Sequence, residues 1–379
     1  MTGMETTAAF RHFVCADCDE TFTADAIEER CPSCDGVLVA RYDHDERDDP
    51  TVPPLPFARE RTVSIDEGGT PATDCPTLAD ELGIDRLLVK DEGRNPTGAV
   101  TDRGLALAVT AAALSGAEDV TLPTTGGGGQ SAAAYAGRAG LDSHSYVPTR
   151  SPFVNKAMIN VHGGDMNVVE GRYPDALAVY EDDRDAAWFP VGPASPYRHE
   201  GVKTIGYELL LDHGTVPDAV VVPAGHGIVL TAIHSAIEEL RATDTVADGP
   251  TLYAAQPEGC VPIVDACGTA DDVIPEAQPD TIVGPLEVPD PALGEHAVAA
   301  IDETGGSAVA VEDSEALQAA VDAASTAGPE LSGTGGVALA GARDLADHFA
   351  DDATVAVVNP VAGSKEDDLL RSHLMSQGL

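Results

Sequence analysis

The sequence predicts an α/β protein with two α/β units, a cleft between them and a small metal-binding module in front. Short β-branched runs alternate with longer Ala-rich runs from Thr62 onward, glycine turns follow the strand-like runs, and two cysteine pairs precede them. Buried apolar strands alternating with amphipathic helices are typical of parallel sheets covered on both faces. We therefore expect a zinc ribbon, an acidic proline-rich linker leading into the large domain, an amino-terminal α/β domain and a carboxyl-terminal α/β domain, at residues 1–45, 46–75, 76–195 and 196–379.

The first segment contains two CxxC pairs, "CADC" (Cys15, Cys18) and "CPSC" (Cys31, Cys34). The residues between the pairs include "ETFTA", a strand-like run. Two such knuckles can supply four thiolates in tetrahedral geometry, so the pattern predicts Zn²⁺. Because protein fills all four positions, the zinc would be structural. Disulfides are the alternative, and the cytoplasmic location expected below disfavours them.

The stretch "DHDERDDPTVPPLP" then indicates a linker, because it is acidic and rich in proline. Five pairs of runs follow, each a β-branched run before an Ala-rich or amphipathic one. They predict strands over residues 86–92, 119–125, 143–149, 165–171 and 218–225. The matching helices are expected from Thr101 and over residues 129–140, 151–164, 173–183 and 227–242.

The formal net charge is −43, and the acidic residues are spread along the chain. This composition indicates a halophilic, haloarchaeal-type protein, because high salt screens repulsion between like charges. Nucleic acid and anionic membranes are excluded as partners, since both require clustered Lys and Arg. No run approaches the roughly 20 apolar residues of a membrane span, and the amino terminus does not resemble a secretory signal. We expect a cytoplasmic protein.

Two glycine turns are candidate ligand sites. "TTGGGGQS" (residues 124–131) follows a strand and opens a helix, so its N–H groups could hold a carboxylate or phosphate. "PAGHGIV" (residues 223–229) is the second such turn. Glycine after a strand is also common in plain tight turns, and neither turn matches a nucleotide-binding fingerprint. The candidate ligand-binding residues are Thr125, Gly126, Gly127, Gly128, Gly225 and Gly227.

The order of these motifs resembles threonine synthase, a fold-type II pyridoxal-phosphate (PLP) enzyme. The resemblance covers nearly the whole chain and rests on the cysteine ribbon followed by "VKDEGRNPTGAVTDRG", "TTGGGGQSAAAYAGRAGL", "ASPYRHEGVKTIGYEL", "VVVPAGHGIVLTAI", "AAQPEGCVPIVDA" and "VAVVNPVAGSKEDD". It implies a tryptophan synthase β-like architecture of two domains. It also implies a homodimer.

Four residues or pairs depart from the family pattern where the family contacts PLP. Thr101 stands where the family lysine forms the Schiff base, and a hydroxyl cannot form one. Gly127 replaces an asparagine, Ile228 and Val229 fill the phosphate turn, and Pro360 replaces the threonine at the pyridine nitrogen. Because these changes converge on one ligand, the sequence argues against PLP as a cofactor.

The remaining lysines do not restore the anchor. Lys90, Lys156, Lys203 and Lys365 match family lysines that do not hold the cofactor. Thr101 as a nucleophile would need a base, and the adjacent Asp102 is interpreted as a helix N-terminal acid. His226 is the candidate for new acid–base chemistry, although a histidine in such a turn is more often structural.

The sequence thus predicts a threonine synthase-like protein that is noncatalytic or catalytically altered. It would bind an amino acid or a phosphorylated amino acid at "TTGGGGQS", or associate with an active paralogue. The alternative is an enzyme: a PLP-dependent lyase or synthase that makes threonine from O-phosphohomoserine with an unusual anchor, or a PLP-free catalyst in the same cleft. Without both the lysine and the PLP electron sink, the family reaction has no evident route.

Overall fold

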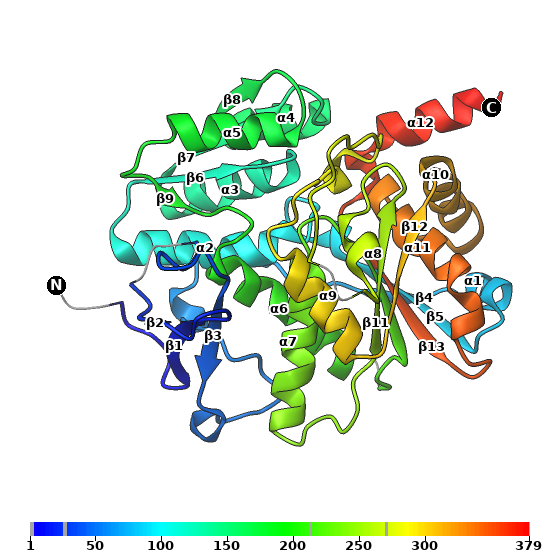
Figure 1. Ribbon diagram of the computed structural model, residues 1–379, viewed down its shortest axis with the longest axis horizontal. Helices are drawn as coiled ribbons and strands as arrows, with labels where there is room; N and C mark the ends of the chain where they lie inside the picture. Colours follow the sequence, from blue (N-terminus) through cyan, green and yellow to red (C-terminus); the bar gives the residue numbers. More distant parts are fainter. Residues whose placement is uncertain (1–3, 26–28, 213, 270–271, 379) are drawn as a thin grey trace.

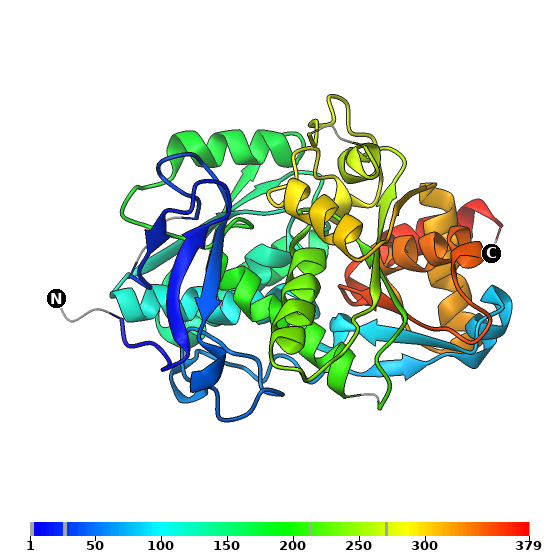
Figure 2. The ribbon, with the colours of Figure 1, turned by 60° about the horizontal axis from the view of Figure 1, so that its bottom comes forward.

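A computed structural model describes residues 4–25, 29–212, 214–269 and 272–378, and it contains three sheets (Figure 1). A three-stranded sheet belongs to the amino-terminal cysteine module, and two larger sheets with surrounding helices form the rest. The cysteine module and the last helix lie at opposite ends of the long axis (Figures 1 and 2). Within the described residues, no helix combines the length and apolarity needed to cross a bilayer.

The cysteine module is an antiparallel sheet of order β2-β1-β3, formed by β1 (Phe10–Cys15), β2 (Thr21–Phe22) and β3 (Leu38–Tyr42). Phe13 is fully buried, and its ring meets that of Tyr197 at 5.1 Å between centroids. Phe57, from the expected linker, stacks on the same tyrosine at 5.6 Å. The segment expected to link the module to the core is therefore packed, because Phe57 is buried in one cluster with Phe13 of the module and Tyr197 of the core.

The smaller α/β sheet has the strand order β8-β7-β6-β9, and all its strands are parallel. Its strands are β6 (Asp119–Pro123), β7 (Asp142–Pro148), β8 (Asp165–Val169) and β9 (Phe189–Pro190). The helices that follow the first three strands are α3 (Gly127–Ala139), α4 (Phe153–Val161) and α5 (Tyr173–Asp183). In Figure 1 this unit forms the upper left of the molecule.

The larger sheet has the order β12-β11-β10-β13-β5-β4 and is parallel except for its edge strand β4. Its strands are β4 (Ala72–Asp74), β5 (Arg86–Asp91), β10 (Ala219–Pro223), β11 (Thr251–Pro257), β12 (Ala308–Val311) and β13 (Thr354–Asn359). Its helices are α1 (Pro76–Leu82), α7 (Ile228–Ala242), α8 (Pro262–Ala266), α9 (Gly294–Glu303), α10 (Asp313–Asp322), α11 (Gly333–Asp344) and α12 (Asp367–Ser376).

The five predicted strand-and-helix pairs are confirmed, but residues 76–195 do not form one sheet. Strand β5 pairs in parallel with β13, from the other end of the chain, and so belongs to the larger sheet. The physical reason is that its middle residues Leu87–Lys90 are buried on both faces, which suits a central strand of either sheet. The apolar residue pattern predicts that this strand is buried, but it does not predict which strand lies beside it.

Two helices connect the α/β units: α2 (Thr101–Ser115) and α6 (Pro196–Leu211). They pack with their backbones in contact, since a Cβ atom on Gly201 would lie 2.0 Å from the Arg103 carbonyl oxygen. Glycine is therefore required at this crossing. The contact fixes the first turn of α2, which carries Thr101, against α6.

Candidate ligand site between the two sheets

A cavity of about 170 Å³ lies at the carboxyl ends of β6 and β10, where open α/β sheets bind ligands. The amino termini of α2, α3 and α7 border it, so both predicted glycine turns meet at one place. The sequence-predicted residues that line this central cavity are Thr101, Thr125, Gly127, Gly128, Gly225, His226 and Gly227. Gly126 lies within the first turn, and its φ of 126° requires glycine.

Thr101 begins helix α2, and its Oγ1 lies 2.8 Å from Ser131 Oγ in a hydrogen bond. The neighbouring Asp102 is buried and accepts hydrogen bonds from the Thr97 backbone N–H at 2.7 Å and hydroxyl at 2.6 Å. Asp102 therefore closes the turn before α2, as expected of a helix N-terminal acid. Its carboxylate is engaged with that turn and not with the Thr101 hydroxyl.

The four-glycine run at the start of α3 has different constraints at each position. A Cβ atom on Gly129 would lie 2.8 Å from Ile159 Cδ1, while one on Gly127 would meet nothing within 4 Å. Because the first N–H groups of a helix have no partner inside it, this end attracts anions. Gly127 and Gly128 bring it to the cavity wall.

Arg198 also lines the central cavity, and the sequence analysis did not single it out. It lies on α6, is only 7% exposed, and makes a long 3.4 Å hydrogen bond from Nη1 to the Val191 carbonyl oxygen. Its Nε has no partner among the described residues, where Arg198 also forms no ion pair. Burial lowers the pKa of Arg198 to about 10, so the guanidinium stays charged. The available signal was a lone arginine inside "ASPYRHEG", in a chain poor in cations.

The second glycine turn places His226 at the mouth of the central cavity. Burial, followed by the charges of Arg198 and Arg30, lowers the pKa of His226 to about 3, so its ring is neutral. Its Nδ1 accepts an N–H from Ala292 at 3.4 Å, which leaves Nε2–H as a donor. The ring also meets Tyr173 edge to face at 5.2 Å. The structure thus favours hydrogen bonding over proton transfer by His226.

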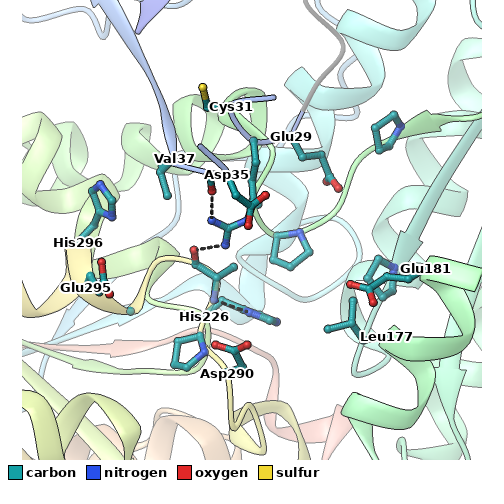
Figure 3. Close-up of a pocket in the computed structure, with 18 of the residues that line it drawn as sticks. Glu29, Cys31, Asp35, Val37, Leu177, Glu181, His226, Asp290, Glu295 and His296 are labelled. Atoms are coloured by element: carbon teal, nitrogen blue, oxygen red, sulfur yellow. Dashed lines mark hydrogen bonds between the residues drawn. The ribbon is translucent and has the colours of Figure 1, made fainter. Parts of the chain in front are cut away.

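A larger outer cavity of about 960 Å³ opens beyond His226 (Figure 3). It lies between the cysteine module, helix α5 and residues 290–296. The two cavities share Pro123, Pro193 and His226 in their walls, so they lie side by side. Sequence reasoning did not find this cavity, because its walls come from three distant parts of the chain.

All four lysines of the chain lie in the described part, and none lines the central cavity. Lys90 pairs with Glu208, Lys203 pairs with Glu200 and Glu239, and the Lys156 amine donates to the Thr149 carbonyl at 2.6 Å. Lys365 donates to Gln130 at 2.7 Å and to Asn155 at 3.4 Å, and Asn155 itself lines the cavity. Burial lowers the pKa of Lys365 to about 8.

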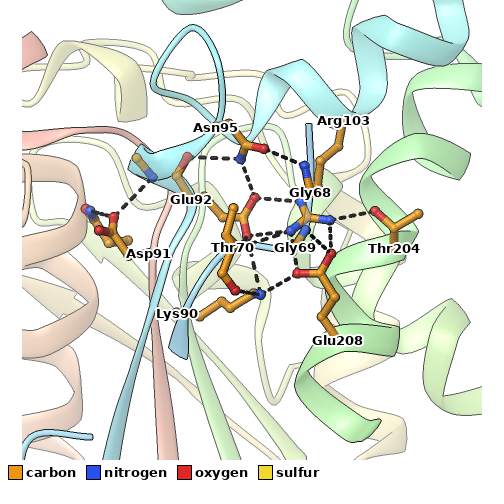
Figure 4. A network of polar contacts seen from close by, with 12 residues as sticks. Gly68, Gly69, Thr70, Lys90, Asp91, Glu92, Asn95, Arg103, Thr204 and Glu208 are labelled. Atoms are coloured by element: carbon orange, nitrogen blue, oxygen red, sulfur yellow. Dashed lines mark hydrogen bonds and ion pairs between the residues drawn. The ribbon is translucent and has the colours of Figure 1, made fainter. Parts of the chain in front are cut away.

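A buried polar network holds the turn that leads to Thr101 (Figure 4). Arg103 donates to Glu92 from Nε at 2.6 Å and to Glu208 from Nη1 and Nη2 at 2.7 Å each. Asn95, in that turn, donates to Glu92 at 2.7 Å. The negative charges of Glu92 and Glu208 are neutralised by the positive charges of Arg103 and Lys90. The network ties β5, α2 and α6 together behind the cavity.

The four cysteines of the amino-terminal module converge in the structure. Their Sγ atoms all lie within 4.8 Å of one another, and all four thiols are free of disulfides. Cys15 and Cys34 are 3.4 Å apart, and Cys18 and Cys31 are 3.6 Å apart. Such spacing suits one tetrahedral ion with metal–sulfur bonds of about 2.3 Å.

Comparison with known proteins gives a consistent family. Residues 63–360 match the model of the family described as pyridoxal-phosphate dependent enzyme. Threonine synthase of Methanosarcina acetivorans is 33% identical over 354 residues, which cover 89% of this chain and 87% of that protein. Threonine synthase of Methanocaldococcus jannaschii is 34% identical over 325 residues, which cover 80% of each.

Solved structures share the fold at lower identity. Diaminopropionate ammonia lyase from Escherichia coli matches with a TM-score of 0.71 at 17% identity, covering 83% of this chain and 89% of that one. Maize serine racemase matches with a TM-score of 0.66 at 18% identity, covering 82% and 94%. The expected α/β fold of fold-type II PLP enzymes is thereby confirmed. By family and fold, the chain belongs to the pyridoxal-phosphate-dependent enzymes and is threonine synthase-like among them.

Proposed function

We propose that this protein is a divergent threonine synthase-like paralogue that binds an amino acid or a phosphorylated amino acid without PLP-dependent turnover. The observation that carries the proposal is that no lysine amine lies in the wall of the central cavity. Thr101 presents a hydroxyl bonded to Ser131 at the lysine position of the family, and none of the chain's lysines lines the cavity.

The residues around the cavity do not fit a covalently held PLP. A Schiff base requires an amine, and position 101 offers a hydroxyl. Pro360, at the position matched to the pyridine contact, lines the cavity and has no hydroxyl or N–H to offer a ring nitrogen. Ile228 and Val229 place branched side chains on the wall where the family turn approaches a phosphate. We therefore assign no reaction step to the cofactor here.

The same cavity suits a small anion. The amino terminus of α3 and the guanidinium of Arg198 both face it, and each favours a carboxylate or phosphate. Neutral His226 adds a donor at the mouth. These groups support a metabolite-binding role, either as a regulator or in association with an active relative. The family also supports a homodimer as a proposal.

The test is direct detection of the cofactor and of turnover. We expect purified protein incubated with PLP to show no aldimine absorbance band and no borohydride-reducible adduct by mass. It should also release no phosphate from O-phosphohomoserine. Either an adduct or phosphate release would contradict the proposal.

Lys365 supports one alternative, an active enzyme with a displaced anchor. Its amine lies beside a cavity-lining residue, and its lowered pKa leaves a substantial neutral fraction near pH 8. An adduct mapped to Lys365 would establish that alternative. Phosphate release without an adduct would point to a PLP-free catalyst in the same cleft.

We further propose that Cys15, Cys18, Cys31 and Cys34 bind one structural zinc ion, and that the distributed acidic surface adapts a cytoplasmic protein to high salt. The converging thiols and the net charge of −43 support these assignments.

Freshly prepared protein is expected to contain zinc at a one-to-one ratio by metal analysis. Because ligand formation and folding are coupled in small metal modules, Cys18→Ala should lose the zinc and unfold the module. Cys267→Ala, outside the cluster, serves as the matched control and should retain zinc. Unchelated wild-type protein without zinc would contradict the assignment.

A further inference from the structure

The cysteine module spans the mouth of the cleft and contacts both α/β units. On one side Glu29 lies against Gly192, where a Cβ atom would come within 2.6 Å of Glu29 Oε1. On the other side Arg30 donates from Nη2 to the Ala292 carbonyl oxygen at 2.7 Å. Glycine at position 192 therefore makes room for the carboxylate. The module thus brings three acidic side chains, Asp17, Glu29 and Asp35, to the outer cavity, and Glu29 and Asp35 are labelled in Figure 3.

Three polar atoms around this junction are buried and have no hydrogen-bond partner in the described part of the chain: Glu29 Oε1, the Tyr180 hydroxyl and Arg198 Nε. Tyr180 is 4% exposed, and Arg198 is 7% exposed. Glu29 and Tyr180 line the outer cavity, while Arg198 lines the central one. Buried polar atoms are normally satisfied, so three of them around two adjacent cavities point to a polar ligand.

The two charged groups are opposite in sign and flank the same piece of backbone. Arg198 Nη1 bonds to the Val191 carbonyl, and Glu29 lies against the next residue, Gly192. Among the described residues the two side chains form no ion pair with each other. The two charges attract each other without direct contact, and each group keeps one atom that has no hydrogen-bond partner in the described part of the chain. Such a pair complements a molecule that carries both charges.

We propose that Glu29 binds the ammonium group of an unphosphorylated amino acid whose carboxylate lies between Arg198 and the amino terminus of α3. The Tyr180 hydroxyl supplies a second polar contact near the ammonium. This assignment rests on the proposed metabolite-binding function and narrows its ligand. Glu29, from the cysteine module, is then a specificity-determining residue of the site.

Electrostatics favours the unphosphorylated ligand. Arg198 and the end of α3 can neutralise one carboxylate in the central cavity. The outer cavity is lined by six carboxylates and only two guanidiniums, those of Arg30 and Arg184, so a phosphomonoester there would add negative charge to an acidic wall. Like charges in a partly buried site repel strongly, since the effective dielectric constant there is far below that of water. Glu29 therefore selects for the ammonium and against the phosphate.

The experiment measures binding by titration calorimetry to the full-length, zinc-loaded protein, with three probes. L-Homoserine carries both charges, 4-hydroxybutyrate lacks the ammonium, and O-phospho-L-homoserine adds the phosphate. We expect homoserine to bind at least about tenfold more tightly than either of the others, since a hydrogen bond to a charged group supports a difference of that size.

Glu29→Gln should remove the preference for homoserine over 4-hydroxybutyrate and should improve binding of the phosphorylated probe. Glu181→Gln is the matched control, because it removes a carboxylate from an exposed position on the same cavity wall and should change none of the affinities. If Glu29→Gln loses its zinc or its fold, Tyr180→Phe replaces it and should weaken homoserine binding selectively.

The outcomes separate this inference from the function it rests on. Equal binding of homoserine and 4-hydroxybutyrate, or an unchanged preference in folded Glu29→Gln, overturns the role of Glu29 while leaving a metabolite-binding protein. Binding of the phosphorylated probe alone also overturns it and assigns the site to phosphorylated amino acids. Failure of all three probes overturns both the inference and the ligand class proposed above.

Discussion

Replacing Thr101 by lysine is expected to leave the protein without threonine synthase turnover. The new amine would enter a cavity that has Gly127 in place of an asparagine, branched side chains at Ile228 and Val229, and Pro360 at the pyridine position. It would also lose the hydrogen bond between Thr101 and Ser131. An amine alone supplies neither the ring contacts nor the phosphate turn on which carbanion chemistry depends. Phosphate release from O-phosphohomoserine, measured in the presence of PLP, should stay at the uncatalysed rate.

Thr101→Val is the matched control, because it also removes the Ser131 hydrogen bond but adds no amine. If Thr101→Lys alone turns over substrate while Thr101→Val does not, only the anchor has been lost and the remaining pocket is competent. That result would replace our interpretation of four converging changes with a single inactivating substitution.

Arg103→Met is expected to lower the free energy of unfolding by about 3–5 kcal/mol, because it leaves buried carboxylates without their main partner. Arg103 is 2% exposed and bonds to both Glu92 and Glu208. Arg241→Met is the control, since the Arg241–Glu238 pair is exposed and such pairs contribute roughly 0–1 kcal/mol. Urea titration followed by circular dichroism measures both. A loss below about 1 kcal/mol for Arg103→Met would contradict the network's stabilising role.

The same network predicts acid sensitivity. Burial alone would raise the pKa of Glu208, but the hydrogen bonds and charge of Arg103 lower it from 4.5 to about 2. A carboxylate with a lowered folded-state pKa stabilises the protein above its unfolded pKa, and this contribution is lost as the pH falls from about 4.5 towards 2. In Arg103→Met this acid-dependent loss should be smaller than in wild type.

The local structure was predictable because each segment carries its own signal. Strands such as Ala219–Pro223 are uniformly buried and end in glycine turns, and the helices after them have capping glycines such as Gly116 and Gly140. The pairing of β5 with β13 was not predictable, since a strand buried on both faces fits between many neighbours. Strand order depends on contacts between residues far apart in the chain.

Some features of the candidate site were also predictable from the sequence, and others were not. The convergence of the two glycine turns follows from a general rule about the carboxyl ends of parallel strands. The positions of Arg198 and Glu29 do not follow from this rule, because Arg198 lies on the connecting helix α6 and Glu29 depends on how the cysteine module packs over the cleft. Glu29 is adjacent to a cysteine knuckle in sequence, yet it lies against Gly192 in the smaller α/β unit. Acidic residues are so common in this chain that composition gives no reason to select it.

The glycine run at the start of α3 also bears on how the site can change over generations. Gly126 needs its positive φ, and Gly129 is crowded by Ile159 and Ser145, so variants there would be removed by misfolding. Position 127 faces open space within the cavity and can accept a side chain without displacing its neighbours. Inherited variation, or a laboratory library, can therefore alter ligand preference at Gly127 while the scaffold stays intact.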